Sequence, residues 1–293
     1  MCTDYYSEFM KNYLSLIKFS HTIFALPFAI IGFVLAVWHE GYAFSWYKLI
    51  LMLLCMVFAR SAAMAFNRYI DRDIDELNPR TKVREIPAGI IQPKNALFFV
   101  IVNSALFVLC TYFINSICFY LSPVALLVIL GYSFTKRFTA LCHLVLGLGL
   151  ALAPIGAYLT VTGQFALLPI LFSIIVFTWV SGFDIIYALQ DDDFDKANNL
   201  HSIPSLLGRK NALNVSTLLH VVCASIVIVA GIIGSFSLIY WIGAGVFIAL
   251  LIYQHTLVNP KDLSKVNLAF FTTNGIASVV LAIFVIGDLI IQL

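Results

Sequence analysis

Two acidic groups with the same spacing are the side chains best suited to chemistry in this 293-residue chain. They are Asn67, Asp71 and Asp75 in NRYIDRDID, and Tyr187, Asp191 and Asp195 in YALQDDDFD. Steps of four residues keep side chains on one face of a helix, where two carboxylates repel and need a counter-charge. Mg²⁺ suits such a site, because it takes oxygen ligands from one or two carboxylates and from substrate phosphates. The spacing therefore predicts two Mg²⁺ sites that face each other and grip a diphosphate.

Basic residues near the acidic groups would complete a phosphate-binding cage. They are Arg72, Arg84, Lys136, Arg137 and Lys18. Arg binds phosphate through a planar fork and Lys as a point charge. A single charged cluster at a helix end is more often a solvated loop, whereas two clusters of matched spacing favour function.

For other charged and titratable residues of the chain, a structural role is predicted. Those predicted to point off the acidic faces into solvent are Asp73, Glu76, Asp192 and Asp193. Those predicted to set membrane topology are Arg68, Arg80, Lys82, Arg209 and Lys210. The single histidines in apolar context, predicted to be packed or hydrated, are His21, His143 and His220.

Arg60 is unusual because it lies inside an apolar run, seven residues before Asn67 and on the same predicted helix face. An Arg within a membrane span is costly unless it faces a cavity or a partner. Its guanidinium fork suits a carboxylate. Arg60 is therefore predicted to bind a carboxylated substrate beside the diphosphate.

The composition indicates a membrane protein. Mean hydropathy is +0.98, 61% of residues are hydrophobic and 11% are charged, against about 25% charged in soluble domains. A helix needs ~20 apolar residues to cross the bilayer. The sequence thus predicts an all-α, polytopic integral membrane protein with a single domain over residues 1–293. Its nine predicted spans are 20–38, 46–66, 95–113, 117–135, 139–160, 165–188, 212–233, 235–253 and 268–290. The net charge of +2 gives no sign of nucleic-acid binding, and no protein partner is indicated.

Lys and Arg lie almost entirely on one side of these predicted spans. Loop 67–94 alone carries six of them, whereas the opposite side has only Lys48. Basic residues favour the cytoplasmic side. The sequence predicts that the N-terminus and loops 67–94 and 189–211 lie in the cytoplasm, and that Leu293 lies outside.

An internal repeat follows the two acidic groups. EIPAGIIQPKNAL (85–97) follows the first group, and SIPSLLGRKNAL (202–213) follows the second. Each stretch leads into the next predicted span. A duplicated four-span half is therefore a plausible origin for spans 2–5 and 6–9.

These motifs, in a chain of nine predicted spans, resemble the UbiA superfamily of intramembrane aromatic prenyltransferases over nearly the whole sequence. Further stretches that resemble the family are KFSHTIFALPFA (18–29), YSFTKR (132–137), SIPSLLG (202–208) and NPKDLSKVNLAFFTTNG (259–275). The resemblance implies a helical bundle with a central cavity in a bacterial cytoplasmic membrane.

The same resemblance implies roles for individual residues. Asp71, Asp75, Asp191 and Asp195 would be catalytic Mg²⁺–diphosphate ligands, and Arg84 and Lys136 would contact the diphosphate. Arg60 and Asn67 would lie near the aromatic acceptor. The remaining residues that it places around the substrates are Arg137, Lys18, Tyr187 and Asp184.

Several substrates and one different class of protein stay open. Transfer of a polyprenyl group to 4-hydroxybenzoate in quinone biosynthesis is the first reading. The stretch at 259–275 resembles the branch assigned to futalosine-type menaquinone synthesis, whose acceptor would be a dihydroxynaphthoate. Both acceptors carry a carboxylate, so Arg60 does not separate them. A secondary transporter is the alternative class, although transporters place charges near the midplane of the membrane.

Overall fold

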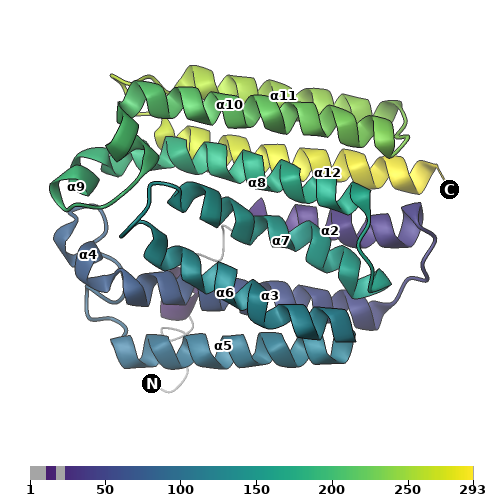
Figure 1. The fold of residues 1–293 in the computed structure, drawn as a ribbon, viewed down its shortest axis with the longest axis horizontal. Helices are drawn as coiled ribbons and strands as arrows, with labels where there is room; N and C mark the ends of the chain where they lie inside the picture. Colours follow the sequence, from purple (N-terminus) through teal and green to yellow (C-terminus); the bar gives the residue numbers. More distant parts are fainter. Residues whose placement is uncertain (1–10, 18–23, 293) are drawn as a thin grey trace. The chain divides into compact units, whose positions relative to one another are not determined.

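The computed structural model describes residues 11–17 and 24–292, and the regular elements in this part of the chain are helices (Figure 1). Eight of these helices are long and apolar enough to cross a membrane, and residues 26–39 form a shorter apolar helix. The all-α membrane fold is therefore confirmed. The prediction of nine spans is close, with the first predicted span represented by the shorter helix.

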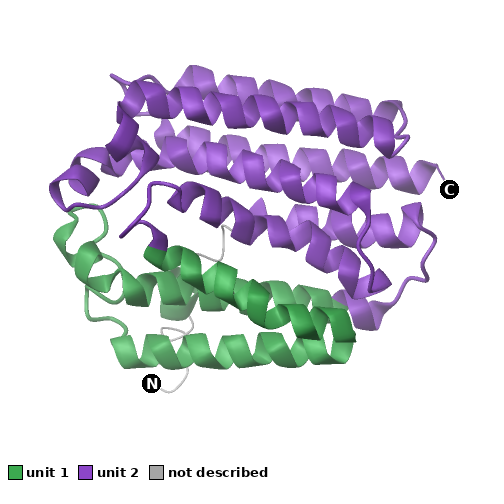
Figure 2. Cartoon of the chain, in the orientation of Figure 1, with its two compact units in different colours: residues 1–22, 50–134 green, residues 23–49, 135–293 purple. Residues whose placement is uncertain are grey.

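The chain divides into two compact units (Figure 2). Unit 1 comprises residues 1–22 and 50–134. It contains most of α3 (Trp46–Ile70), then α4 (Arg72–Leu77), α5 (Pro93–Ile114) and most of α6 (Ser116–Thr135). Its core includes Ala62 and Ala65 of α3, Ala96 of α5 and Ile86 of the loop between α4 and α5. That loop is therefore anchored to the helices on either side of it.

Unit 2 comprises residues 23–49 and 135–293. Its helices are α2 (Leu26–Val34), the π-helix η2 (Leu35–His39), α7 (Cys142–Thr162), α8 (Leu167–Ala188), the 3₁₀ turn η3 (Leu189–Asp191), α9 (Asp192–Ala197), α10 (Ile203–Ile233), α11 (Leu238–Leu257), the π-helix η4 (Leu268–Thr273) and α12 (Asn274–Ile291). α8 packs between α7 and α10, α11 packs on α12, and α2 packs on α7. Bulky side chains fill the interior, among them the fully buried Trp179 of α8.

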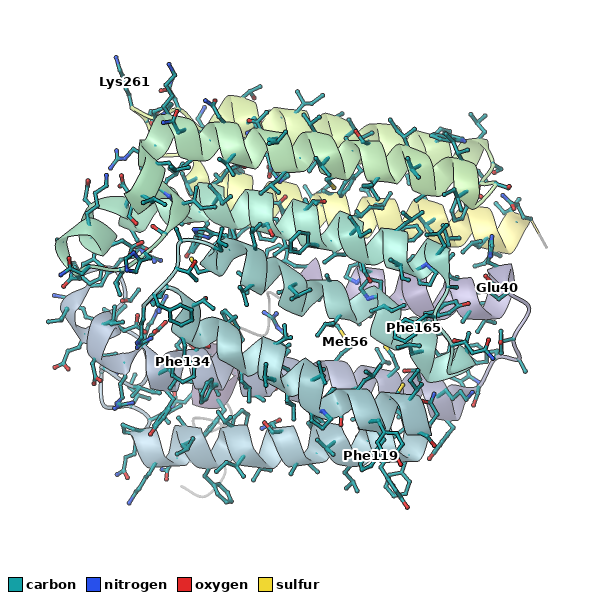
Figure 3. The ribbon with its side chains drawn as sticks, viewed as in Figure 1. Glu40, Met56, Phe119, Phe134, Phe165 and Lys261 are labelled. Atoms are coloured by element: carbon teal, nitrogen blue, oxygen red, sulfur yellow. The ribbon has the colours of Figure 1, made fainter. Side chains whose placement is uncertain are left out.

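The two ends of unit 2 differ in character. Glu40 and Lys261 mark these opposite ends (Figure 3), and α9 lies at the Lys261 end (Figure 1). At the other end, the buried carboxylate of Asp288 accepts hydrogen bonds from the backbone N–H groups of Ser237 (3.0 Å) and Tyr240 (3.2 Å). The Ser237 hydroxyl and the Gln292 amide also donate to it. A residue of α12 thus caps the first turn of α11, where backbone donors lack helical partners and favour negative charge.

α10 begins earlier than its predicted span, at Ile203 instead of residue 212. Ser202 and Ser205 form a capping box, and Pro204 occupies the first turn, where proline is well tolerated. Gly208 interrupts the helix with φ 75° and ψ 162°, a conformation that glycine adopts without a Cβ clash. The hydrophobic run alone therefore locates only the part of α10 beyond this break.

Candidate active site

The first acidic group lies in unit 1 at the end of α3. The helix passes through a turn at Asp71 into α4, yet the i→i−4 hydrogen bonds continue, with Asp71 N–H to Asn67 O at 2.9 Å and Asp75 N–H to Asp71 O at 2.7 Å. The chain leaves the helix after Leu77, and Asn78, which precedes Pro79, is extended. The helix therefore runs beyond residue 66, where the predicted span ends, and stops before Pro79 because the residue before a proline disfavours the α region. Asp71 and Asp75 are both buried.

Each buried carboxylate has a polar partner in unit 1. The Asn67 amide donates to Oδ2 of Asp71 at 3.0 Å. Arg84 donates through Nη1 to both oxygens of Asp75, at 2.7 and 2.8 Å. Thr81 donates its hydroxyl to the backbone oxygen of Asp75 at 3.1 Å, which holds the Arg84 loop against α4. A buried carboxylate needs such compensation, because desolvation without a partner costs several kcal/mol.

The other predicted basic residues of unit 1 lie differently. Arg72 donates to the backbone oxygen of Tyr69 at 2.7 Å, and its guanidinium lies 4.8 Å from the centre of the Tyr69 ring. Its Nε is 3.5 Å from Asp73, so its contacts are with neighbours that lie off the acidic face. Arg60 is partly buried in α3, close enough to Tyr132 of α6 to interact electrostatically.

The second acidic group lies in unit 2, where α8 passes through η3 into α9. The Ser202 side chain lies close to the Asp195 carboxylate, and the charges of Asp191 and Lys136 act on that carboxylate. The backbone N–H of Leu200 donates to the backbone oxygen of Asp195 at 2.8 Å. The structure thus brings Asp191, Asp195 and Lys136 close enough to interact. Arg137 is next to Lys136 in the turn after α6 and is partly exposed.

Tyr187 lies one helical turn before Asp191 and stacks on Phe270, with ring centroids 4.1 Å apart. Phe270 belongs to η4, and the amide of Asn274 donates to the backbone oxygens of Ala269 and Phe270 at 2.9 and 3.1 Å. π-helical turns occur often at functional sites. The wide turn of η4 therefore places an aromatic ring against the predicted substrate side of α8.

One prediction about solvation is wrong. Asp192 was expected in solvent but has a relative exposure of only 2%. Arg209 binds it through Nε at 3.0 Å and Nη2 at 2.8 Å, and also contacts Asp193 at 2.9 Å. Arg209 follows the break at Gly208, and its bonds to Asp192 connect α10 to α9. This structural role comes in addition to the predicted role of Arg209 in membrane topology. Asp73, Glu76 and Asp193 are exposed as predicted, whereas Arg68, expected to act in topology, is buried.

Two further residues were not foreseen as parts of this region. The Ser202 side chain lies close to Asp195, and Nδ1 of His143 donates to Oδ2 of Asp184 at 2.7 Å. The repeat of an Ile-Pro pair was the sequence signal that could have pointed to Ser202. Nothing in the sequence could have joined His143 to Asp184, which lie 41 residues apart. Lys18, a predicted substrate ligand, lies outside the described residues.

The donor atoms fit a hard divalent cation. Within residues 11–17 and 24–292, no group of three or more His, Cys, Asp or Glu side chains is arranged to hold a metal. Each unit instead offers two carboxylates four residues apart, which matches a cation whose remaining ligands are water and phosphate oxygens. Asp71 and Asp75 belong to unit 1, and Asp191 and Asp195 to unit 2. That the two pairs face each other across a central cavity stays a prediction.

Comparison with known proteins decides the family. The model of the UbiA prenyltransferase family matches residues 25–276, which include both acidic groups. The chain belongs to the UbiA prenyltransferase family. It is thus a membrane-embedded transferase, and the family assignment disfavours the transporter alternative.

Relatives of this UbiA-family protein agree with the assignment. A 4-hydroxybenzoate octaprenyltransferase of Aliivibrio salmonicida is 31% identical over 231 residues, which cover 78% of this chain and 80% of that protein. A UbiA homologue from Aeropyrum pernix K1 has 32% identity and a TM-score of 0.81, covering 93% of this chain and 97% of that one. A UbiA homologue from Archaeoglobus fulgidus bound to DMAPP and Mg²⁺ shares the fold, with 21% identity, a TM-score of 0.76 and coverage of 96% and 99%.

Proposed function

We propose that this UbiA-family protein transfers a polyprenyl group from a polyprenyl diphosphate to 4-hydroxybenzoate, with Mg²⁺ as cofactor. The observation that carries the proposal is the buried pair Asp71 and Asp75 with Arg84 beside it, together with a second pair near Lys136. This is the set of charges that a diphosphate and divalent cations require. The name of the Aliivibrio relative supports the acceptor.

The proposed reaction breaks the allylic C–O bond of the prenyl diphosphate, and the electron pair leaves with the diphosphate. Arg84 and Lys136 bind phosphate oxygens and stabilise the charge that develops there. Mg²⁺, held by Asp71, Asp75, Asp191 and Asp195, would supply Lewis-acid stabilisation of the same charge. A site embedded in the membrane keeps water from the allylic cation.

The acceptor is attacked at a ring carbon next to its phenol. Arg60 binds the acceptor carboxylate through its guanidinium fork, and the Asn67 amide helps to orient the ring. Asp191 accepts the phenolic proton as the new C–C bond forms. The resulting cyclohexadienone then moves the proton from the attacked carbon to its carbonyl oxygen, which restores the aromatic phenol, and the proton held by Asp191 is the one released overall.

An assay of purified protein tests this function. A defined polyprenyl diphosphate is supplied with 4-hydroxybenzoate, and separately with a dihydroxynaphthoate, with Mg²⁺ and after chelation. We expect Mg²⁺-dependent prenylation of 4-hydroxybenzoate. Prenylation of the naphthoate alone would move the enzyme to menaquinone synthesis, which the resemblance at 259–275 favours. Transfer to neither acceptor, beside an active relative as positive control, would refute the proposal.

The protein is an integral membrane protein, and we propose that it lies in a bacterial cytoplasmic membrane with its acidic loops in the cytoplasm. Thr81 is buried, whereas Val83 in the same loop is 73% exposed and better suited to labelling. A cysteine at Val83, in a variant without its native cysteines, should react with a membrane-impermeant maleimide only after the cells are opened. Labelling of intact cells would reverse the predicted orientation.

A further inference from the structure

Two turns of similar sequence return to the last carboxylate of each acidic pair. In unit 1, Arg84 precedes Glu85-Ile86-Pro87 and binds Asp75. In unit 2, Ser202 precedes Ile203-Pro204, and its side chain lies close to the Asp195 carboxylate. Ile86 and Ile203 are buried in the cores of their own units. The repeated Ile-Pro pair therefore marks two turns, each of which anchors an isoleucine and presents a polar group to an Asp.

The turn in unit 2 is held by a buried histidine that has no counterpart among the described contacts of the turn in unit 1. His143 of α7 is 3% exposed, and its Nε2 accepts the backbone N–H of Ile203 at 3.3 Å. Its Nδ1 lies 2.7 Å from Oδ2 of Asp184 on α8. His143 thus connects α7, α8 and the start of α10.

These contacts define which nitrogen of His143 carries the proton. Because the Ile203 N–H donates to Nε2, that nitrogen offers its lone pair. Nδ1 then carries the hydrogen and donates to the Asp184 carboxylate, an arrangement that fixes both the tautomer and the orientation of the ring. With both nitrogens engaged and the ring buried, His143 acts through the turn and does not itself reach a substrate.

The same turn also holds the loop that carries Lys136. The backbone N–H of His201 donates to the backbone oxygen of Lys136 at 2.7 Å. The thiol of Cys142, next to His143, lies 3.5 Å from the backbone oxygen of His201. Leu200, just before this turn, donates its backbone N–H to the backbone oxygen of Asp195 at 2.8 Å. The turn at 201–203 is therefore connected both to Asp195, a predicted metal ligand, and to Lys136, a predicted diphosphate ligand.

We propose that His143 and Asp184 are positioning residues, which hold the turn at 201–203 so that Asp195 and Lys136 are set for Mg²⁺ and diphosphate. This inference rests on the proposed prenyl transfer and adds residues to that site. Partners behind a metal ligand commonly contribute about 10- to 100-fold in metal affinity or activity. Loss of the His143 contacts to Asp184 and to the turn should therefore raise the Mg²⁺ and prenyl diphosphate concentrations needed for transfer. The KM for the aromatic acceptor should stay largely unchanged.

The test is a double-mutant cycle on His143→Leu and Ser202→Ala. The readouts are the Mg²⁺ concentration for half-maximal transfer and the Mg²⁺-dependent binding of farnesyl thiolodiphosphate, whose C–S bond resists cleavage. Each single variant should weaken both by about 10-fold. If His143 acts through Ser202, the double variant should lose only about 10- to 20-fold, because coupled residues are not additive. A loss of about 100-fold in the double variant, which is the product of the two single effects, would overturn the proposal.

Further variants separate positioning from general damage. His143→Gln keeps a donor and an acceptor and should recover much of the loss, and Asp184→Asn should weaken Mg²⁺ use even if His143→Leu fails to fold. His220→Leu removes another buried imidazole of unit 2 and should leave the Mg²⁺ dependence within about twofold. Equal losses toward Mg²⁺, diphosphate and acceptor in all variants would indicate a structural role only. Binding of the thiolodiphosphate remains measurable if no acceptor is prenylated, so failure of the proposed function is distinguishable.

Discussion

Replacing any one of Asp71, Asp75, Asp191 or Asp195 by Asn should lower kcat/KM for prenyl transfer by on the order of 100-fold or more. Removal of one group that stabilises charge in a transition state typically costs 10²–10³ in rate, and each substitution removes an anionic ligand from the site proposed to bind Mg²⁺ and a diphosphate. Asn preserves the size of the side chain, so folding should be little affected. Steady-state transfer at saturating Mg²⁺ measures the effect.

Two acidic neighbours provide matched controls for this prediction. Asp73 lies in the same helix as Asp75 but has a side-chain exposure of 77%, and Asp193 lies beside Asp192 with 85%. Asp73→Asn and Asp193→Asn should retain transfer within about twofold, as is usual for exposed positions. Near-normal turnover in two of the four substituted ligands would refute the model of two acidic pairs.

Replacing Arg60 by Ala should weaken use of the aromatic acceptor by ~10- to 100-fold, which corresponds to the ~1.5–3 kcal/mol of a charge-assisted hydrogen bond. The KM for the prenyl diphosphate should change little, because other residues are proposed to hold the diphosphate. Arg60→Lys should recover part of the loss, since an ammonium lacks the planar fork. Steady-state kinetics with each substrate varied in turn measure the two effects separately.

The exposed Arg80 of the loop after α4 serves as the control for loss of a guanidinium. Arg80→Ala should affect neither substrate by more than about twofold. If Arg60→Ala instead raised the KM for the diphosphate and spared that for the acid, Arg60 would belong to the phosphate-binding set. The assignment of Arg60 to the acceptor would then be wrong.

Local pattern was enough to predict the helical part of the candidate site. The continuation of α3 past Phe66 and its end before Pro79 follow from side-chain periodicity and from the steric limits of a residue before proline. Asp71 and Asp75 accordingly lie where a continuous helix places them. The capping box at Ser202 and Ser205 was also readable in principle, yet the hydrophobic run concealed the earlier start of α10.

The parts that sequence did not predict depend on contacts between distant residues. Asp192 was expected in solvent because a regular α-helix would turn it outward, but η3 is a 3₁₀ turn, which winds more tightly. Arg209 meets Asp192 because Gly208 breaks α10. The pairing of His143 with Asp184 depends on the packing of α7 against α8, and no local pattern encodes it.

The cap that Asp288 provides for α11 bears on how genetic screens of this protein should be interpreted. Asp288 is buried at the end of unit 2 opposite α9, and it satisfies the first turn of a neighbouring helix. A substitution there leaves backbone donors unpaired, and changes of 1–2 kcal/mol alter cellular abundance several-fold. In a screen scored by growth or prenyl transfer, Asp288 would therefore be grouped with the four Asp residues proposed as metal ligands. Quantification of the protein in each strain separates a lost helix cap from a lost reaction.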